Sequence, residues 1–207
     1  MKSSLRSTRT GWSIRLAQYG FTLFGILALG YCLGEYLNAR FFQAKETRNF
    51  DMALHAKAGA APKPAILIAP PAIPREGSIV GRLEIPRLGV AVMVVEGVED
   101  GDLKRAAGHI PGTALPGEPG NVGIAAHRDT FFRPLRSIRR DDTITLNTLQ
   151  GAYCYRVVST QVVPANDTQV LYPTGQDSLT LVTCFPFDWI GSAPKRFIVR
   201  AERTAGA

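Results

Sequence analysis

A cysteine and an arginine stand at facing ends of two apolar runs near the end of the chain. The run SLTLVTC (178–184) ends on Cys184, and twelve positions later Arg196 opens the apolar part of KRFIVRAER (195–203). If the runs are neighbouring antiparallel strands, Cys184 and Arg196 lie side by side. A guanidinium beside a thiol favours the nucleophilic thiolate, and its N–H groups can hold a substrate carbonyl or a developing oxyanion.

His127 provides the acid or base that this pair lacks. It ends a third apolar run, NVGIAAH (121–127), and polar residues follow it. Cys184, Arg196 and His127 would then stand at the ends of three strands, on one rim of a barrel where an extended peptide could lie. Cysteine as nucleophile and histidine as proton donor and acceptor are the parts of covalent catalysis.

Both the cysteine and the histidine have alternatives. Cys184 could be a core residue, or it could form a disulfide with Cys154 in an oxidising compartment. His109 is a second candidate general acid, although its Gly- and Pro-rich surroundings favour a structural role in a loop.

Four further side chains near the three candidates have a less certain role. Arg128 and Arg200 could each take the place of Arg196. Thr183 could contact substrate, although a β-branched residue is also simply a good strand former. Asp129 could orient the histidine as in a catalytic triad, but we leave it outside the candidate catalytic set.

Charge and cysteine content exclude several classes of function. Residues 1–78 carry ten Lys+Arg against four Asp+Glu, whereas residues 79–207 carry fourteen against thirteen. The excess of the net charge of +7 therefore lies in the N-terminal part, which argues against a nucleic-acid-binding face on the rest. The three cysteines form no CxxC pair and lie at no metal-ligand spacing from histidine, so we expect no metal and no cofactor.

An apolar stretch near the N-terminus predicts a membrane span. Residues 16–34 contain no charged side chain, and nineteen residues at about 1.5 Å each nearly cross a bilayer core. We assign residues 16–37 to the anchor and residues 1–15, which carry only basic charges, to a cytoplasmic tail. A cleaved signal peptide is the alternative, but we see no clear small-x-small cleavage site after the stretch.

Residues 38–77 are expected to link the span to a domain of residues 78–207 outside the cytoplasm. Residues 35–55 continue the helical pattern, with His55 as a solvated helix residue. The Ala- and Pro-rich segment 56–78 has no packing pattern and is typical of an extended spacer.

The expected domain consists mostly of short strands with turn signals between them. Residues 99–110 could form a short helix, and residues 168–173 (TQVLYP) join the expected strands. This pattern predicts an all-β barrel or sandwich with few helices. The other expected strands are 79–86, 90–97, 121–127, 142–148, 152–165, 178–184 and 195–203.

Three of these segments resemble a known family, the sortases, which are membrane-anchored cysteine transpeptidases of bacterial surfaces. Thr180–Cys184 meets the TLxTC pattern, the histidine of NVGIAAHRDTFFRPL precedes it, and Arg196 follows. The segment GHIPGTALPGEPGN (108–121) also looks sortase-like. With the run CFPF that begins at Cys184 and a single N-terminal span, the chain is most similar to class D sortases.

The resemblance implies a closed eight-stranded β-barrel with short helices, which follows one N-terminal transmembrane helix. It also implies catalysis by Cys184, His127 and Arg196 on an LPxTx-like sorting signal of surface proteins. The acceptor would be an amine of a cell-wall precursor or a pilin.

Three other functions stay open. A membrane-tethered cysteine peptidase would use the same residues and pass the product to water. An L,D-transpeptidase-type enzyme is disfavoured because no Ser-His-Gly-Cys run occurs. A non-catalytic surface β-barrel would carry an unreactive Cys184.

Overall fold

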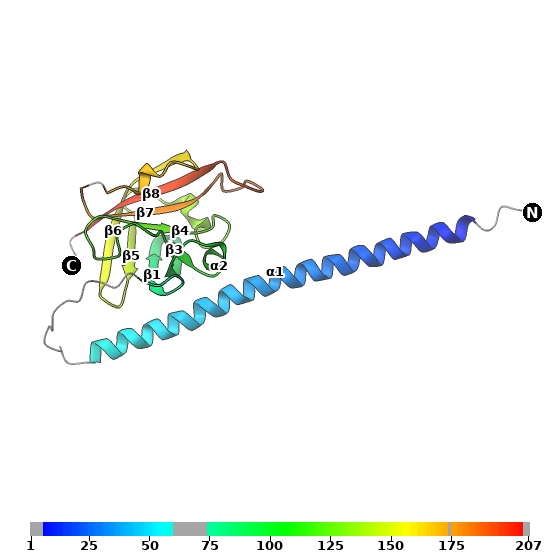
Figure 1. Cartoon of the computed structure of the whole chain (residues 1–207), viewed down its shortest axis with the longest axis horizontal. Helices are drawn as coiled ribbons and strands as arrows, with labels where there is room; N and C mark the ends of the chain where they lie inside the picture. Colours follow the sequence, from blue (N-terminus) through cyan, green and yellow to red (C-terminus); the bar gives the residue numbers. More distant parts are fainter. Residues whose placement is uncertain (1–5, 60–73, 174, 205–207) are drawn as a thin grey trace, which may run out of the picture. The chain divides into compact units, whose positions relative to one another are not determined.

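The computed structural model describes residues 6–59, 74–173 and 175–204. The chain forms two compact units, Met1–Phe41 and Phe42–Ala207. One long helix, α1 (Arg6–Gly59), runs through the first unit and into the second (Figure 1).

The part of α1 in the first unit is apolar and unpacked. Its large side chains from Trp12 to Leu37 are exposed, among them Phe21, which is 80% exposed. The helix is long and apolar enough to cross a membrane, by length and composition. This makes the first part of α1 a candidate membrane span.

The second unit is a closed antiparallel and parallel barrel with the strand order β1-β2-β3-β4-β7-β8-β6-β5 (Figure 1). This confirms the predicted all-β class and the closed eight-stranded barrel. The strands are β1 (Ile79–Ile85), β2 (Val90–Glu96), β3 (Ala107–His109), β4 (Asn121–Ala125), β5 (Thr143–Asn147), β6 (Ala152–Pro164), β7 (Ser178–Phe185) and β8 (Lys195–Arg203). The short helices are η1 (Pro86–Leu88), α2 (Asp100–Leu103), η2 (Arg133–Ser137) and η3 (Gln169–Leu171).

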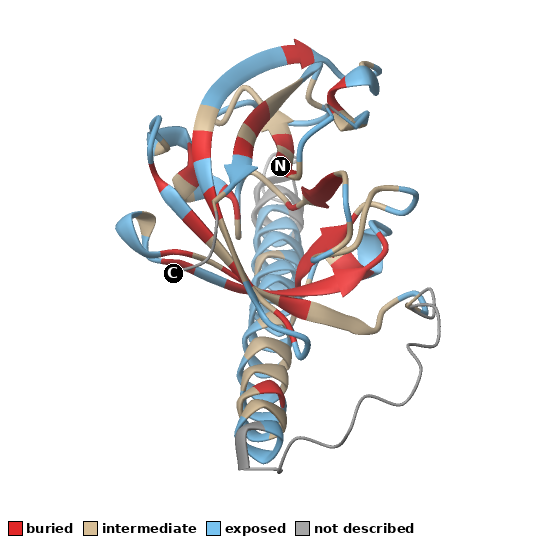
Figure 2. Ribbon diagram, turned by 90° about the vertical axis from the view of Figure 1, so that its left-hand side faces the viewer, coloured by how far each residue is buried: buried red, intermediate tan, exposed pale blue. Residues whose placement is uncertain are grey.

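The barrel core follows from the two-residue period of its strands. In β7, Leu179 and Leu181 are fully buried in the main core, so the side chain of Thr180 between them points to the outer face. Figure 2 shows the buried residues along the strands of the barrel. Tyr155 of β6 is 2% exposed, and burial raises the pKa of its hydroxyl to about 12.

One parallel pair in the barrel positions the candidate site. β4 runs parallel to β7, with Asn121 opposite Ser178 and Ala125 opposite Val182. Both strands therefore end at the same edge, and β8 starts there because it is antiparallel to β7. The connection that a parallel pair requires contains β5 and β6.

The last part of α1, Phe42–Gly59, packs on the barrel instead of standing clear of it. Gln43 accepts a hydrogen bond from the backbone N–H of Met93 at 2.9 Å and donates one to the carbonyl of Arg105 at 2.7 Å. Phe50 is 4% exposed. The buried aromatic ring of Phe50 and the two hydrogen bonds of the Gln43 amide make this segment part of the folded unit.

Three predicted segments differ from the structure. Helix α1 extends to Gly59, into the start of the expected spacer, and residues 60–73 of that spacer lie outside the described residues. In 99–110 only one turn is helical, because Ala107–His109 instead pairs with both β2 and β4. The prediction of a strand at 168–173 was wrong: its centre is the 3₁₀ turn η3, which buries Val170.

Candidate active site

Cys184 and Arg196 are direct neighbours across two strands. Near the end of β7, Cys184 is paired with Arg196 at the start of β8, as the spacing of the two runs predicted. Paired residues of antiparallel strands have Cα atoms about 4.5–5.5 Å apart and side chains on the same face. That face is the outer one, because Leu181 and Val199 on the alternate positions lie in the barrel core. A half-buried free thiol therefore stands beside a half-buried guanidinium.

His127 follows β4 at the same edge of the sheet. The strand is extended by one hydrogen bond, from the N–H of Ala126 to the carbonyl of Val182 at 3.2 Å. Thr183 donates its hydroxyl to the carbonyl of Ala126 at 2.8 Å and is 2% exposed. The structure thus places His127, Cys184 and Arg196 at one end of three adjacent strands, and it places Thr183 on the inner side.

The three candidate arginines differ in what their guanidinium groups contact. Arg196 uses only Nη1 in hydrogen bonds within the described structure, to the carbonyls of Ala193 at 3.1 Å and Lys195 at 3.0 Å. These bonds fix its side chain and leave Nη2 and Nε available to a ligand. Arg128 binds the carbonyls of residues 189 and 191 instead, and Arg200 binds a carbonyl of η3.

His109 has a structural position. It is 2% exposed, with Nδ1 2.7 Å from a carboxylate oxygen of Glu96 and Nε2 3.0 Å from the carbonyl of Ala114. Both ring nitrogens are therefore occupied inside the protein, where His109 joins β2 and β3 to the loop before β4. The structural role favoured from its sequence surroundings agrees with this arrangement.

Two further alternatives concern Cys154 and Asp129. Cys154 and Cys184 are both free thiols, on β6 and β7. Asp129 is exposed, and in the described structure no hydrogen bond or ion pair joins it to His127. Exposed His55 lies on α1, as expected.

The connection between β7 and β8 is braced from two sides. Phe185, Phe187 and Phe197 pack together, with ring centroids 5.3–6.4 Å apart. On the other side Arg128 holds the loop carbonyls, and Arg136 forms an ion pair with Asp188 at 2.9 Å. This bracing fixes the connection that runs from Cys184 to Arg196.

An apolar cluster that was not predicted from the sequence lies on the same outer face as Cys184. It surrounds buried Ile198, which lies between Arg196 and Arg200 on the outer face of β8. The signal was present in TQVLYP, but we assigned that segment to a strand. The other members of the cluster are Val163, Val170, Leu171 and Val182.

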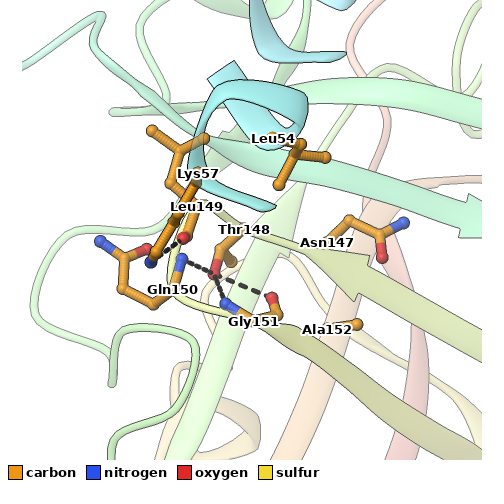
Figure 3. Close-up of a pocket in the computed structure, with 8 residues that line it drawn as sticks. All are labelled: Leu54, Lys57, Asn147, Thr148, Leu149, Gln150, Gly151 and Ala152. Carbon is orange, nitrogen blue, oxygen red and sulfur yellow. Dashed lines mark hydrogen bonds between the residues drawn. The ribbon is translucent and has the colours of Figure 1, made fainter. Parts of the chain in front are cut away.

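A hollow of about 410 Å³ lies elsewhere, where the end of α1 meets the β5–β6 turn (Figure 3). Thr148 organises that turn by accepting hydrogen bonds from the backbone N–H groups of Gln150 and Gly151 at 3.1 and 3.2 Å. Lys57 donates to the carbonyl of Leu149. The turn is at the opposite end of β6 from Pro164, which pairs with Lys195 beside the candidate site.

Within residues 6–59, 74–173 and 175–204, no three His, Cys, Asp or Glu side chains are grouped to hold a metal ion. The chemistry that the site can perform with its own groups is attack by a thiolate, proton transfer by an imidazole and oxyanion binding by a guanidinium.

Comparison with curated proteins finds bacterial sortases. Sortase D of Bacillus subtilis is 34% identical over 131 residues, which are 63% of this chain and 66% of that protein. Sortase A of Listeria monocytogenes is 28% identical over 129 residues, 60% of this chain and 56% of that protein. The chain thus matches less than two thirds of the length of each of these relatives.

Solved structures agree on the fold. A sortase C1 of Streptococcus agalactiae matches with a TM-score of 0.59 and 28% identity, and the match covers 66% of this chain and 72% of that one. A Sortase D5 transpeptidase of Clostridium perfringens matches with a TM-score of 0.62 and 23% identity, over 81% of this chain and 99% of that one. The model of the Sortase domain matches residues 83–204, more than half of the chain and the whole of the candidate site, so this protein belongs to the sortase family.

Proposed function

We propose that the chain is a membrane-anchored transpeptidase that cleaves an LPxTx-like sorting signal and joins the new carboxyl end to an amine. The pairing of Cys184 with Arg196 on the outer face, at the edge where β4 delivers His127, carries this proposal. A nucleophile, a group that carries protons and a hydrogen-bond donor to the oxyanion then come together at one edge of the sheet.

In the first half-reaction the thiolate of Cys184 attacks the carbonyl carbon of the threonine in the signal. The negative charge that develops on the carbonyl oxygen is bound by the free N–H groups of Arg196. The C–N bond then breaks, and the leaving amine takes a proton from the imidazolium of His127. The products are a thioester on Cys184, a neutral His127 and a released peptide with a free amino group.

In the second half-reaction an acceptor amine attacks the thioester carbonyl. Neutral His127 takes the proton that the amine loses, and the Cys184 thiolate leaves as the new amide forms. Water in place of the amine gives the hydrolysed signal. The partners are therefore surface proteins with the signal, and an amine on a cell-wall precursor or a pilin.

The buried hydroxyl of Thr183 suits a positioning role better than a contact with substrate. Its hydrogen bond to Ala126 fixes the backbone beside His127, and its side chain is 2% exposed. We assign it to the support of the site.

For the location of the domain we propose residues 1–15 in the cytoplasm, residues 16–37 in the membrane and residues 78–207 outside. The basic residues that precede the span support this orientation. Labelling of the Cys154 or Cys184 thiol in intact cells by a membrane-impermeant maleimide tests it. Labelling only after cell lysis would place the domain inside.

The reaction is tested with the full chain in detergent micelles. An LPxTx peptide library is added with and without triglycine, and intact-mass spectrometry follows protein and products. We expect an acyl adduct that is absent in Cys184→Ala, present in the control Cys154→Ala, and converted to a triglycine-joined product. Hydrolysis alone, at every triglycine concentration, would instead favour the peptidase. A folded and reduced protein that forms no adduct with any peptide would contradict both.

A further inference from the structure

The carbonyl of Val170, in the middle of turn η3, receives hydrogen bonds from two different strands. Asn121 at the start of β4 donates through Nδ2 at 3.3 Å, and Arg200 of β8 donates through Nη2 at 2.6 Å. The Val170 side chain is 7% exposed and packs with Ile198 and Val163. The turn is therefore fixed to the outer face of the sheet by its backbone as well as by its side chain.

The orientation of the Asn121 amide is determined by its other partners. The side chain is 2% exposed, and its Oδ1 accepts hydrogen bonds from the hydroxyls of Thr180 at 2.8 Å and Ser178 at 3.1 Å. Because hydroxyl donors occupy the oxygen, the amide nitrogen must point away from them, toward Val170. A buried amide with hydrogen bonds to β7 through its oxygen and to η3 through its nitrogen ties β4, β7 and η3 together.

Arg200 is the second donor to the carbonyl of Val170. It lies on the outer face of β8, two positions from Ile198 and four from Arg196, and is paired with Thr180. Its Nη1 is buried without a hydrogen-bond partner among the described residues. Among the described residues the half-buried guanidinium of Arg200 makes one hydrogen bond, to the carbonyl of Val170. We therefore assign it the role of holding that carbonyl in place.

The turn that these two residues hold provides part of the apolar surface beside Cys184. Val170 and Leu171 come from the turn, whereas Val182 and Ile198 come from the strands that carry Cys184 and Arg196. A peptide that presents its carbonyl to Cys184 and lies along this face would place an apolar side chain against the cluster. The position of η3 therefore decides which side chains fit.

We propose that Asn121 and Arg200 are positioning residues that set substrate affinity and selectivity by fixing η3 through the carbonyl of Val170. This inference rests on the proposed transpeptidase function for its kinetic consequence. Its structural consequence, the order of η3, does not depend on that function.

The test uses the full chain in detergent micelles and the variants Asn121→Ala and Arg200→Met. Arg156→Met is the matched control, because Arg156 is an exposed arginine on β6 with no hydrogen bond or ion pair in the described structure. Hydrogen exchange of residues 165–173 is followed by mass spectrometry, and kcat and KM are measured with the best library peptide. Peptides with Ala in place of the leucine of the signal measure selectivity.

We expect backbone exchange in 165–173 to rise at least about tenfold in Asn121→Ala and Arg200→Met, but not in Arg156→Met. KM should rise about tenfold while kcat changes less than about threefold, since Cys184, His127 and Arg196 are untouched. The preference for the leucine peptide over the alanine peptide should fall. Arg200→Lys keeps a donor on a shorter reach and should restore part of the affinity.

Unchanged exchange in 165–173 would overturn the inference whatever the kinetics. Faster exchange together with unchanged KM and selectivity would also overturn it, because η3 would then not shape the substrate site. If Asn121→Ala does not fold, Arg200→Met carries the test, since its side chain is only partly buried. If the wild-type chain processes no peptide, the proposed function fails, and the exchange measurement still decides whether Asn121 and Arg200 hold the turn.

Discussion

Thr183 donates a 2.8 Å hydrogen bond to the carbonyl of Ala126, and each of these residues immediately precedes a proposed catalytic residue. The bond joins the end of β7 to the segment that leaves β4, so it fixes the backbone of Cys184 relative to that of His127. Neither residue has to contact substrate to matter for catalysis.

Replacement of Thr183 by valine keeps the shape of the side chain and removes its hydroxyl. The Ala126 carbonyl is then buried without that donor, which costs about 1–3 kcal/mol of unfolding free energy. We expect kcat for peptide cleavage to fall about tenfold, because His127 loses its alignment. Thr183→Ser should retain most of kcat. Equal kcat in the valine and wild-type chains would show that the hydrogen bond has no part in the alignment.

Arg196→Lys keeps the positive charge but loses the planar fork that Ala193 and Lys195 fix. If Arg196 binds the oxyanion, kcat/KM should fall by about 10²–10³ in Arg196→Ala and nearly as far in the lysine variant. The control Lys195→Gln removes an exposed neighbouring charge and should have little effect. Activity retained in Arg196→Lys, with similar losses in Arg196→Ala and Lys195→Gln, would indicate a general effect of positive charge instead.

Phe50→Ala tests whether the end of α1 belongs to the folded unit. Loss of a buried phenylalanine costs about 3–5 kcal/mol, which corresponds to a fall in Tm of roughly 6–20 °C for a unit of this size. Met52 is 62% exposed on the same helix, so Met52→Ala should leave Tm nearly unchanged. Thermal unfolding of both variants, measured by near-UV circular dichroism in detergent, distinguishes a packed helix from a free spacer.

The Arg87–Asp142 pair predicts an acid-dependent loss of stability. The hydrogen bonds from the Arg87 guanidinium hold the pKa of Asp142 below its usual value, against the opposing effect of burial. The stabilisation is therefore complete above the pKa of about 3.9 of an unfolded aspartate, and it is lost as pH falls through the lower pKa of the folded chain.

Asp142→Asn should consequently lower the unfolding free energy at pH 7 and flatten its decline between about pH 5 and pH 2. Urea titrations across this range measure both effects. Asp129→Asn, which changes an exposed carboxylate, is the control and should follow the wild-type curve. A parallel decline in Asp142→Asn and wild type would assign the acid sensitivity to other carboxylates.

The relationship between Cys184 and Arg196 could be predicted from sequence because it depends only on local rules. Two apolar runs joined by a short Pro- and Gly-containing connection form an antiparallel pair, and the ends of such a pair meet. The long apolar helix in α1, a candidate membrane span, was predictable because an uncharged apolar stretch is readily recognised in sequence.

Features that depend on distant contacts were not predictable. Ala107–His109 forms a strand only because β2 and β4 lie on either side of it, and three residues show no period of their own. The sequence TQVLYP has β-branched and aromatic residues, yet Asn121 and Arg200 fix its centre as a turn. The packing of Gln43 and Phe50 on the barrel depends likewise on partners far away in the chain: Met93 and Arg105 for Gln43, and Arg82 for Phe50.

The thioester on Cys184 is the central claim, and it can be observed directly. The full chain is mixed with the best library peptide without any amine, quenched in acid and digested, and the acylated peptide is sequenced by mass spectrometry. We predict an adduct on Cys184 alone, absent in Cys184→Ala, retained in Cys154→Ala and removed by neutral hydroxylamine as a thioester must be. Cleavage of the peptide that persists in Cys184→Ala, or an adduct on another residue, would contradict the account.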